Sequence, residues 1–313
     1  MPRLARLGDS GRARRTPGRR PARAGPLALA IDPKRHGATH PQYVRQIRLC
    51  RRLWPIYRHP NAIHKQPHGS ESAPMNKKKK ILITGAAGLI GGHLRHHWGD
   101  RYQLRLADIR PVENLAPHEE FIDMDIAQYD PFVAACQDID VVVHLAADPS
   151  PRAGFYPSLL ELNIKGCYNA FAAAHRAHCQ RVVFASSIHA ILGYRDRGEV
   201  PSDAPVYPTN LYGASKCWGE ALARVYSEAH NLSCICVRIG TAAWTQENGG
   251  DPQQLAAGIS ARDQAQLFAC CIDAPEEVKF KIVHGVSKHT RSWMDLSVSQ
   301  ELGYEPQDGT AFL

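Results

Sequence analysis

The segment from Ile81 to Gly91 constrains the fold more strongly than any other part of the 313-residue chain. It opens with the apolar run Ile-Leu-Ile-Thr and continues without a break into the turn Gly85-Ala86-Ala87-Gly88-Leu89-Ile90-Gly91. A helical pattern follows the turn, and a second apolar run begins at Gln103. A strand, a glycine turn, a helix and a second strand in this order predict the first crossover unit of a parallel sheet.

Strand-like runs and helical stretches alternate along the rest of the chain. The runs are short and apolar on both faces, and they cover 81–84, 103–108, 120–125, 140–146, 181–186, 233–239 and 280–285. The stretch 157–177 between two of them has apolar residues at helical spacing. Strands that are apolar on both faces need helices on both sides of the sheet. We therefore predict a doubly wound parallel α/β fold of the Rossmann type, without internal repeats.

The glycines of the turn predict a dinucleotide site. In this pattern Gly85 permits the tight turn, Gly88 lets the backbone approach a pyrophosphate, and Gly91 allows the helix to pack closely on the strand. The N–H groups and the dipole at the start of the following helix attract the phosphates.

Asp108 predicts which dinucleotide binds. It ends the second predicted strand, 20 residues after Gly88. A carboxylate at this position accepts hydrogen bonds from the ribose hydroxyls and repels a 2′-phosphate, so the prediction is NAD rather than NADP. Arg110 nearby would weaken that preference. The alternative is that Asp108 is an exposed loop acid without a ligand.

The positive charge of the chain is concentrated in its first quarter. The formal net charge is +8, but residues 1–74 hold 14 Arg and 2 Lys against Asp9, Asp32 and Glu71, so the remainder is mildly acidic. The Arg-, Pro- and Gly-rich composition of 1–74 predicts a disordered extension. It fits a nucleic-acid-binding arm, an organellar transit peptide or, the interpretation we favour, sequence upstream of a natural start at Met75. Loss of the folded protein on removal of 1–74 would contradict that interpretation.

We expect three segments along the chain. They are the basic extension 1–74, an NAD-binding domain 75–240, and a small substrate cap 241–313 that includes the last strand and helix. No run of 18 apolar residues occurs, so no membrane span is expected. The nine cysteines are scattered without a paired framework, which predicts reduced packing cysteines in the cytoplasm and no metal site.

Tyr212 and Lys216 lie four residues apart at the start of an amphipathic helical pattern. That spacing puts both side chains on one face of the helix. An ammonium near a phenol favours the phenolate, which can take a proton from a hydroxyl or return it to a carbonyl. The same lysine can reach the hydroxyls of a nicotinamide ribose. Ser186 and Ser187 end the preceding strand, at the edge where ligands bind in such sheets.

These motifs together resemble the extended short-chain dehydrogenases/reductases. The resemblance runs in order and spacing from about residue 79 to 240, over the glycine turn, Asp108, Asp125-Ile126, His-Leu-Ala-Ala (144–147), Asn-Ile-Lys-Gly (163–166), Ser186-Ser187 and Tyr-Gly-Ala-Ser-Lys (212–216). It implies that Ser187, Tyr212 and Lys216 form the catalytic triad and that Asn163 is a structural anchor. It also implies cofactor contacts beyond the glycines and Asp108: Leu89, Ile90, Ile109, Asp125, Ile126, Leu145, Ala146, Ala147, Lys216 and Ile239.

A narrower resemblance is to the NAD-dependent uronate dehydrogenases and related sugar dehydrogenases, including glucose-6-phosphate dehydrogenases of this fold. It rests on the segments 181–194, 211–226, 236–241 and 259–272. Members oxidise the anomeric hydroxyl of a hexose derivative, a uronate or a sugar phosphate, to a lactone. The resemblance implies that Ile188, His189 and Thr241 contact this substrate beside Ser187. Without the resemblance, His189 would be interpreted as a hydrogen-bonded structural histidine.

Two positions depart from the pattern of that family. Ile188 follows the serine pair where the family usually has Asn, and Gln253 and Gln254 stand in the segment 249–258 where the family usually carries an Arg. Such an arginine pairs with the carboxylate or phosphate of the substrate. Arg152 or Arg262 could take its place only if loops bring them in. The departure therefore affects the anionic substrate and leaves the redox chemistry unchanged.

Other functions remain open at this point. A nucleotide-sugar epimerase shares the scaffold, but it needs room for a nucleotide, and only 73 residues follow Gly240. A dehydratase needs a further acid/base pair beside the triad serine, where this chain has Ile188 and His189. A non-catalytic NAD-sensing protein is a further alternative, against which the retained Tyr212 and Lys216 argue.

The expected partners are a small sugar and a second copy of the chain. By analogy with relatives, a homo-oligomer would form through the helices that start near Pro157 and Asn210. Contact with nucleic acid is expected through the basic extension alone, if at all, and contact with a membrane is not expected.

Overall fold

The computed structural model describes residues 78–242 and 256–310. Contacts divide the chain between Ser70 and Glu71, and every described residue belongs to the second unit. The predicted extension 1–74 therefore lies outside the described residues. Gln253, Gln254 and the rest of 249–255 lie outside them as well.

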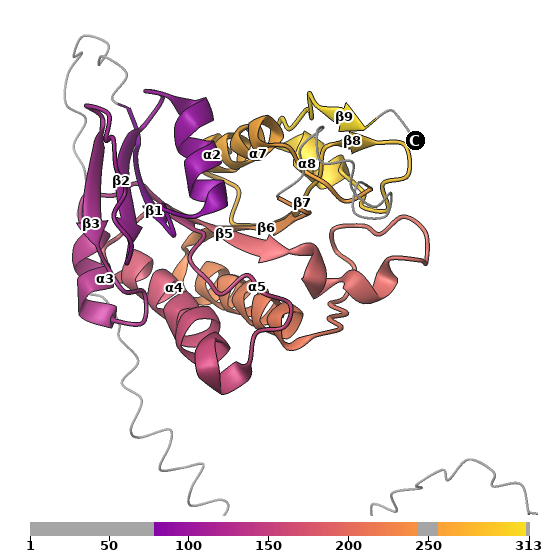
Figure 1. The fold of residues 1–313 in the computed structure, drawn as a ribbon, viewed down its shortest axis with the longest axis horizontal. Helices are drawn as coiled ribbons and strands as arrows, with labels where there is room; N and C mark the ends of the chain where they lie inside the picture. Colours follow the sequence, from indigo (N-terminus) through magenta and orange to yellow (C-terminus); the bar gives the residue numbers. More distant parts are fainter. Residues whose placement is uncertain (1–77, 243–255, 311–313) are drawn as a thin grey trace, which may run out of the picture. The chain divides into compact units, whose positions relative to one another are not determined.

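A seven-stranded parallel sheet forms the centre of this unit (Figure 1). Its strands stand in the order β3-β2-β1-β4-β5-β6-β7, and each neighbouring pair is parallel. The strands are β1 (Lys80–Thr84), β2 (Gln103–Asp108), β3 (Glu119–Asp123), β4 (Val141–His144), β5 (Arg181–Ser187), β6 (Ser233–Ile239) and β7 (Phe280–Gly285). The predicted doubly wound parallel fold is confirmed. β3 ends at Asp123, two residues before the end of the predicted run 120–125. The Asp125 carboxylate accepts the Ala127 N–H at 2.8 Å and turns the chain there.

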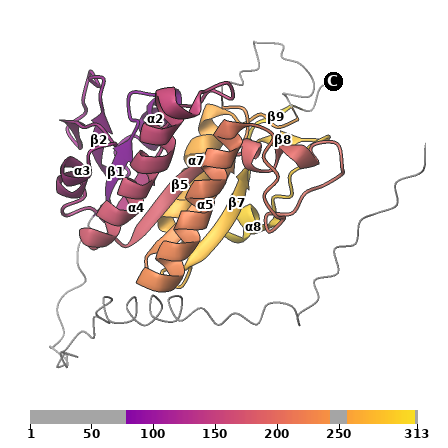
Figure 2. The same ribbon diagram turned by 90° about the horizontal axis from the view of Figure 1, so that it is seen from below.

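Helices cover both faces of the sheet (Figures 1 and 2). One face carries α2 (Leu89–Trp98), α7 (Ala261–Asp273) and the short α8 (Ser297–Glu301). The other carries α3 (Tyr129–Ala135), η1 (Phe155–Gly166), α4 (Cys167–Arg176) and α5 (Leu211–His230). Because side chains alternate along a strand, Ile81 and Ile83 pack in the apolar core between the sheet and α2 and α7. Leu82 packs in the core on the other face, between the sheet and α3, α4 and α5. None of the described helices has the length and apolar character that a bilayer crossing requires.

The predicted helix 157–177 consists of two helices of different pitch. A π-helix, η1, runs to Gly166 and continues as α4. Pro157 lies in the first turn of η1, where its missing N–H group breaks no helical hydrogen bond. A Cβ on Gly166 would lie 2.6 Å from the Ile126 side chain, so the junction packs tightly against the chain that follows β3. Apolar periodicity predicts the helix but not this change of pitch.

Several short elements were not predicted from the sequence. They are the 3₁₀ turns η2 (Ile188–Ala190) and η3 (Leu192–Tyr194) and the paired strands β8 (Lys288–His289) and β9 (Gly309–Thr310). Two or three residues are too few for a periodic pattern. Because β7 and α7 belong to the main sheet and its covering layer, residues after 240 contribute to the nucleotide-binding fold, and the boundary at 240 stays a prediction.

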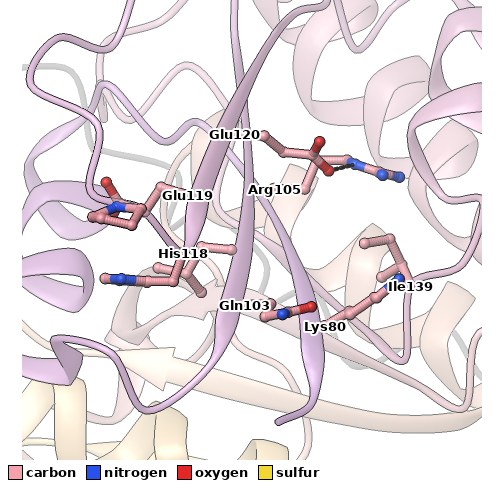
Figure 3. A pocket seen from close by; sticks show the side chains of 9 residues that line it. Lys80, Gln103, Arg105, His118, Glu119, Glu120 and Ile139 are labelled. Atoms are coloured by element: carbon pink, nitrogen blue, oxygen red, sulfur yellow. Dashed lines mark hydrogen bonds and ion pairs between the residues drawn. The ribbon is translucent and has the colours of Figure 1, made fainter. Parts of the chain in front are cut away.

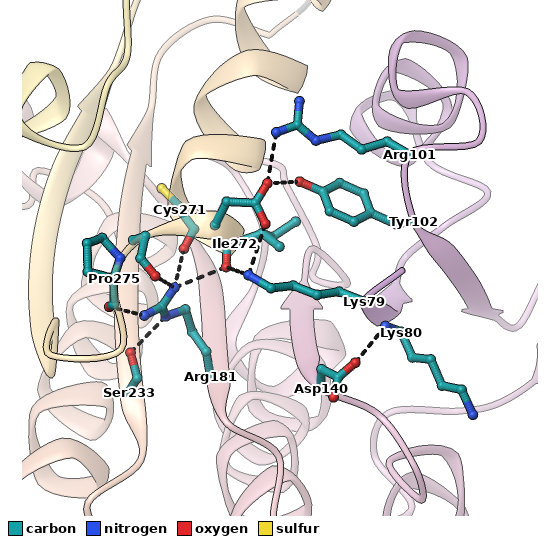
Figure 4. A network of polar contacts seen from close by, with 12 residues as sticks. Lys79, Lys80, Arg101, Tyr102, Asp140, Arg181, Ser233, Cys271, Ile272 and Pro275 are labelled. Carbon is teal, nitrogen blue, oxygen red and sulfur yellow. Dashed lines mark hydrogen bonds and ion pairs between the residues drawn. The ribbon is translucent and has the colours of Figure 1, made fainter. Parts of the chain in front are cut away.

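Arg181 connects the start of β5 to the end of α7 (Figure 4). It is 5% exposed, and its guanidinium donates to four carbonyl oxygens at 2.8–3.0 Å, those of Cys271, Ile272, Ala274 and Pro275. Its Nε also donates to Ser233 Oγ at 2.8 Å. Carbonyl groups in the last turn of a helix have no partner inside the helix. Arg181 therefore supplies the donors that the end of α7 lacks.

Asp273 makes a second connection at the same end of α7 (Figure 4). Its carboxylate accepts from Lys79 at 2.9 Å, from Arg101 at 2.8 Å and from Tyr102 at 2.6 Å. Burial opposes its charge, but these three hydrogen bonds hold the pKa of Asp273 below its usual value. The end of α7 is thereby fixed to the residues that precede β1 and β2.

Arg181→Met should lower the free energy of unfolding by about 3 kcal/mol, because it leaves several buried carbonyl oxygens without donors. Urea denaturation measures the change. Arg101→Met is the matched control, since Arg101 is an exposed partner of Asp273 and exposed ion pairs contribute about 1 kcal/mol or less. Equal losses in the two variants would contradict the role assigned to Arg181.

Candidate active site

Two glycines of the turn after β1, Gly85 and Gly91, have no space for a side chain. Gly85 has a φ of +73°, and a Cβ there would lie 2.7 Å from the Ala146 nitrogen. A Cβ on Gly91 would lie 2.5 Å from the Ala86 carbonyl oxygen. The Gly88 N–H closes the turn on the Gly85 carbonyl at 3.0 Å, and α2 begins at the next residue. Bare backbone at a helix N-terminus is what a pyrophosphate needs, so these residues fit a dinucleotide.

Asp108 is held beside this turn at the carboxyl end of β2. Its two oxygens accept hydrogen bonds from the Ala87 and Arg110 N–H groups, each at 3.0 Å. The Arg110 guanidinium lies 3.7 Å from the carboxylate and donates to the Ala87 carbonyl oxygen at 3.1 Å. Asp108 is 9% exposed, so it is not an exposed loop acid. Its oxygens keep lone pairs that can accept from ribose hydroxyls.

The other predicted cofactor positions lie along the same edge, where the parallel strands end. Leu89 and Ile90 begin α2, Ile109 follows β2, Asp125-Ile126 follows β3, 145–147 follows β4, and Ile239 ends β6. Leu89 and Ile109 are 53% and 69% exposed, which leaves apolar surface at this edge for a ligand to cover. Ile126 differs, because its side chain is buried against Gly166 and belongs to the core next to this edge.

The two serines at the end of β5 have different surroundings because successive side chains of a strand point to opposite faces. Ser186 Oγ donates to Glu220 Oε1 at 2.6 Å inside the protein. Ser187 Oγ accepts only the His189 N–H, at 3.2 Å, among the described residues. Ser187 therefore keeps its hydroxyl proton for another partner, as its predicted role requires.

Tyr212 and Lys216 are brought to the same strand end by α5. The Asn210 side-chain oxygen accepts the Gly213 N–H at 2.7 Å and fixes where the helix begins. Lys216 Nζ lies 5.6 Å from the centre of the Tyr212 ring. It is buried, and it donates to the Ala185 carbonyl oxygen at 2.9 Å. Since Ala185 directly precedes the serine pair, Tyr212 and Lys216 lie near the end of β5 that carries Ser187.

His189 lies against Tyr212, with the ring centroids 5.4 Å apart and the rings edge to face. The amide nitrogen of Asn210 donates to His189 Nδ1 at 2.8 Å, and this assignment places the ring proton on Nε2. Burial, and then the positive charge of Arg195, lowers the pKa of His189. His189 is therefore a neutral donor at neutral pH. It is hydrogen-bonded within the fold and also adjacent to the predicted base.

Asn163 connects the loop after β4 to α5. Its amide oxygen accepts the Asp148 N–H at 2.8 Å, and its amide nitrogen donates to the Asp148 carbonyl at 3.1 Å. The same nitrogen donates to Ser215 Oγ at 2.9 Å. Because Ser215 lies between Tyr212 and Lys216 in the sequence, these bonds hold the helix face of the candidate site against the loop.

The predicted substrate positions differ in what they offer. The Ile188 side chain packs into an apolar cluster that includes Val286, so it belongs to the core beneath the site. Thr241 is half-buried and pairs through its backbone with Gly258. Arg262, considered as an anion receptor, is engaged elsewhere, since its Nε binds Asp308 at 3.2 Å. Arg152 is exposed in the loop after β4.

The ion pair between Glu220 and Arg238, which lies directly behind the site, was not predicted from the sequence. Arg238 binds both oxygens of Glu220, at 2.8 and 2.9 Å. Two signals were available. Glu220 follows Lys216 by four residues, and Arg238 is a charged residue in an otherwise apolar strand.

A surface pocket of about 290 Å³ lies at the opposite edge of the sheet, where β1, β2 and β3 begin (Figure 3). Its acids are paired, since Glu120 binds Arg105 at 2.5 Å and Glu119 binds Arg95 at 2.7 Å. It contains none of the predicted site residues. Ligands of doubly wound sheets bind at the carboxyl ends of the strands. We therefore assign the candidate active site to the carboxyl edge of the sheet and not to this pocket.

A parallel sheet with this glycine turn, a buried acid at the end of its second strand and a Ser–Tyr–Lys set at its carboxyl edge is typical of dinucleotide-dependent oxidoreductases. A profile of the NAD dependent epimerase/dehydratase family matches residues 81–278. The chain belongs to this family, and its cofactor is NAD.

Individual relatives narrow the comparison. The NAD-dependent glucose-6-phosphate dehydrogenase of Haloferax volcanii is 33% identical over 250 residues, which cover 74% of this chain and 94% of that protein. The uronate dehydrogenase of Agrobacterium fabrum is 35% identical over 232 residues, which cover 74% of this chain and 85% of that protein. The crystal structure of uronate dehydrogenase from Agrobacterium tumefaciens matches with a TM-score of 0.67 and 34% identity, covering 74% of this chain and 85% of that one.

The unmodified protein should bind NADH more tightly than NADPH, and Asp108→Ala should strengthen NADPH binding about tenfold, or ~1.4 kcal/mol. The reason is that the substitution removes a charge that repels the 2′-phosphate. Fluorescence titration with both reduced cofactors measures the dissociation constants. Asp108→Asn is the matched variant, because it loses the charge but keeps an acceptor for the Ala87 N–H. It therefore separates the effect of the charge from the effect of the lost hydrogen bond. Equal affinity of the unmodified protein for both cofactors would contradict this role.

Proposed function

We propose that this protein is an NAD-dependent dehydrogenase that oxidises the anomeric hydroxyl of a hexose derivative, a uronate or a sugar phosphate, to a lactone. The observation that carries the proposal is the convergence of Ser187, Tyr212 and Lys216 at the sheet edge that also holds the glycine turn. The relatives named above, a glucose-6-phosphate dehydrogenase and uronate dehydrogenases, support this class of substrate. The L-arabinose 1-dehydrogenase (NAD(P)(+)) of Haloferax volcanii, 29% identical over 253 residues, supports oxidation at a sugar carbon.

In this proposal Tyr212 is the base that takes the proton of the sugar hydroxyl. Lys216 stabilises the phenolate electrostatically, and its remaining N–H groups serve the nicotinamide ribose. The Ser187 hydroxyl donates to the sugar oxygen as it becomes a carbonyl. His189 presents Nε2–H as a further donor beside it. Bound NAD supplies the electron acceptor, and the residues of the chain orient the substrate and move the proton.

The alternative, a nucleotide-sugar epimerase, has less support. The crystal structure of a UDP-galactose 4-epimerase matches with a TM-score of 0.58 and 22% identity, which shows a shared fold and nothing about its substrate. The described residues after β6 also complete the main sheet, because they include α7 and β7. A small sugar suits the remaining cap better than a nucleotide sugar does.

Arg195 is the described cation best placed to receive an anionic substrate group. It is half-buried after η3, and its charge is felt at the candidate site, because burial and, after it, the positive charge of Arg195 lower the pKa of His189. A guanidinium in this position can pair with a carboxylate or phosphate, a role that Arg262 cannot fill while it binds Asp308.

A homo-oligomer and a cytoplasmic location complete the proposal. Leu211, Trp218 and Val225 are exposed along α5 at a spacing of seven residues, and Tyr156 and Tyr168 are exposed on η1 and α4. Such a stripe suits the same surface of a second copy, and sedimentation as a monomer would contradict it. The cysteines of the described residues are free, which agrees with a reducing compartment.

Tyr212→Phe should fold and bind NADH as the unmodified protein does, because it removes only the hydroxyl. Turnover should fall about 10²–10⁴-fold, the usual contribution of general acid–base catalysis. Formation of NADH from glucuronate, galacturonate, glucose-6-phosphate and glucose measures it. We expect the rate of the unmodified protein to rise with pH, and this rise should be missing in the variant. A Phe variant near the original rate would refute the mechanism, and interconversion of UDP-sugars without sugar oxidation would favour the epimerase.

Arg195→Gln should raise the KM of the anionic sugar about tenfold, since it removes the charge that receives the anion. The kcat should change little, and the KM for NAD should not change. Arg197→Gln is the control, because Arg197 stacks on the Tyr207 ring 5.1 Å away. An unchanged ratio of KM values for glucose-6-phosphate and glucose would exclude Arg195 as the receptor.

A further inference from the structure

A buried polar network lies directly behind the candidate site and joins β5, α5 and β6. Ser186 Oγ donates to Glu220 Oε1 at 2.6 Å. Arg238 Nε donates to that same oxygen at 2.8 Å, and Arg238 Nη2 donates to the other oxygen at 2.9 Å. Ser186, Glu220 and Arg238 are 3%, 4% and 1% exposed. The network is therefore closed to solvent and bonded at every carboxylate oxygen.

The network shares its strand and its helix with the triad. Glu220 follows Lys216 by four residues in α5, so the two side chains lie on one helix face. Lys216 binds the Ala185 carbonyl oxygen and Glu220 binds Ser186 Oγ. Two consecutive residues of β5 are thus fixed to one face of one helix, and Ser187 is the next residue.

We propose that Ser186, Glu220 and Arg238 position Ser187 and Lys216 for catalysis, a role that rests on the sugar dehydrogenase function proposed above. They are positioning residues and do not touch the substrate. A displacement of 1 Å between reacting groups can cost about 10²-fold in rate. Short hydrogen bonds to a buried carboxylate are directional, and they restrain such a displacement better than apolar contacts do.

Stability alone does not account for the network. A buried ion pair loses about as much through desolvation as it gains through attraction, and apolar side chains of similar volume are often at least as stable. The directional restraint on β5 is what apolar side chains would not supply. That restraint acts on the one strand that ends in Ser187.

The opposite ends of the same two strands provide an internal comparison. Arg181 at the start of β5 donates to Ser233 Oγ at the start of β6, at 2.8 Å. Arg181 pairs with Ser233 in the β5–β6 register, as Ser186 pairs with Arg238. At each end a buried serine lies opposite a buried arginine of the neighbouring strand, directly bonded at one end and joined through Glu220 at the other, and only the latter end carries the candidate site.

Ser186→Ala and Ser233→Ala form a matched pair, since each removes one buried hydroxyl. Ser186→Ala should lower kcat about tenfold and leave the KM for NAD within twofold. Ser233→Ala should lower the unfolding midpoint and leave kcat within twofold. The rates are measured with whichever of glucuronate, galacturonate and glucose-6-phosphate the unmodified protein oxidises best. Unchanged kcat in Ser186→Ala, or an equal loss in Ser233→Ala, would overturn the positioning role.

The double substitution Glu220→Leu, Arg238→Met separates positioning from stability. It removes both charges at similar volume, so the unfolding midpoint should stay close to the original one. The kcat should nevertheless fall about tenfold, as in Ser186→Ala. A double variant with the kcat of the unmodified protein would overturn the proposal. Ser186→Ala decides the case if the double variant does not fold.

Hydrogen exchange at residues 185–188 tests positioning without a substrate. The amides should exchange about tenfold faster in Ser186→Ala than in the unmodified protein or in Ser233→Ala. This contrast, found in a protein that oxidises none of the sugars, would contradict the dehydrogenase function and support the restraint. Sugar oxidation without the contrast in exchange or kcat would overturn the restraint and leave the function standing.

Discussion

The contact between Gly85 and Ala146 is the constraint on which the rest of the site depends. β1 pairs with β2 on one side and with β4 on the other, so the chain changes direction across the sheet at this strand. Ligands of doubly wound sheets bind where that change opens a crevice. A Cβ on Gly85 would lie 2.7 Å from the Ala146 nitrogen, so the loops after β1 and β4 touch through bare backbone. The two loops that carry predicted cofactor positions, 85–91 and 145–147, are therefore fixed relative to each other.

Charge is arranged unevenly around this edge. Lys216 is buried and binds a carbonyl oxygen, while the nearest carboxylate on its helix face, Glu220, is bound by Arg238. His144 lies close to Lys216, and burial, followed by that positive charge, lowers its pKa to about 3. The imidazole therefore stays neutral and adds no second positive charge beside the lysine. An ammonium that has no carboxylate partner among the described residues is available to a phenolate and an oxygen-rich ribose, as the proposed mechanism requires.

Much of the fold and the centre of the site could be predicted from the sequence. Buried parallel strands are continuous apolar runs, and the glycine turn has steric requirements that only glycine meets, so both leave a clear pattern. Tyr212 and Lys216 could be placed because four residues are about one helical turn. The pitch of η1, the pairing of Glu220 with Arg238 and the bonds of Arg181 could not be predicted. Each depends on which surfaces meet after folding, and a single charged residue in an apolar strand does not identify its partner.

The bonds of Arg181 also bear on how the parts of the chain depend on one another. An arginine from the middle of the sequence supplies the donors for the end of α7, a helix that begins after residue 260. Asp273 at the same helix end binds Lys79, which precedes the first strand. Segments near the two ends of the described fold are thus bonded to each other, so loosening either one would leave polar groups of the other without partners. The predicted cofactor domain and the predicted substrate cap share these bonds, so a ligand bound to either would stabilise both.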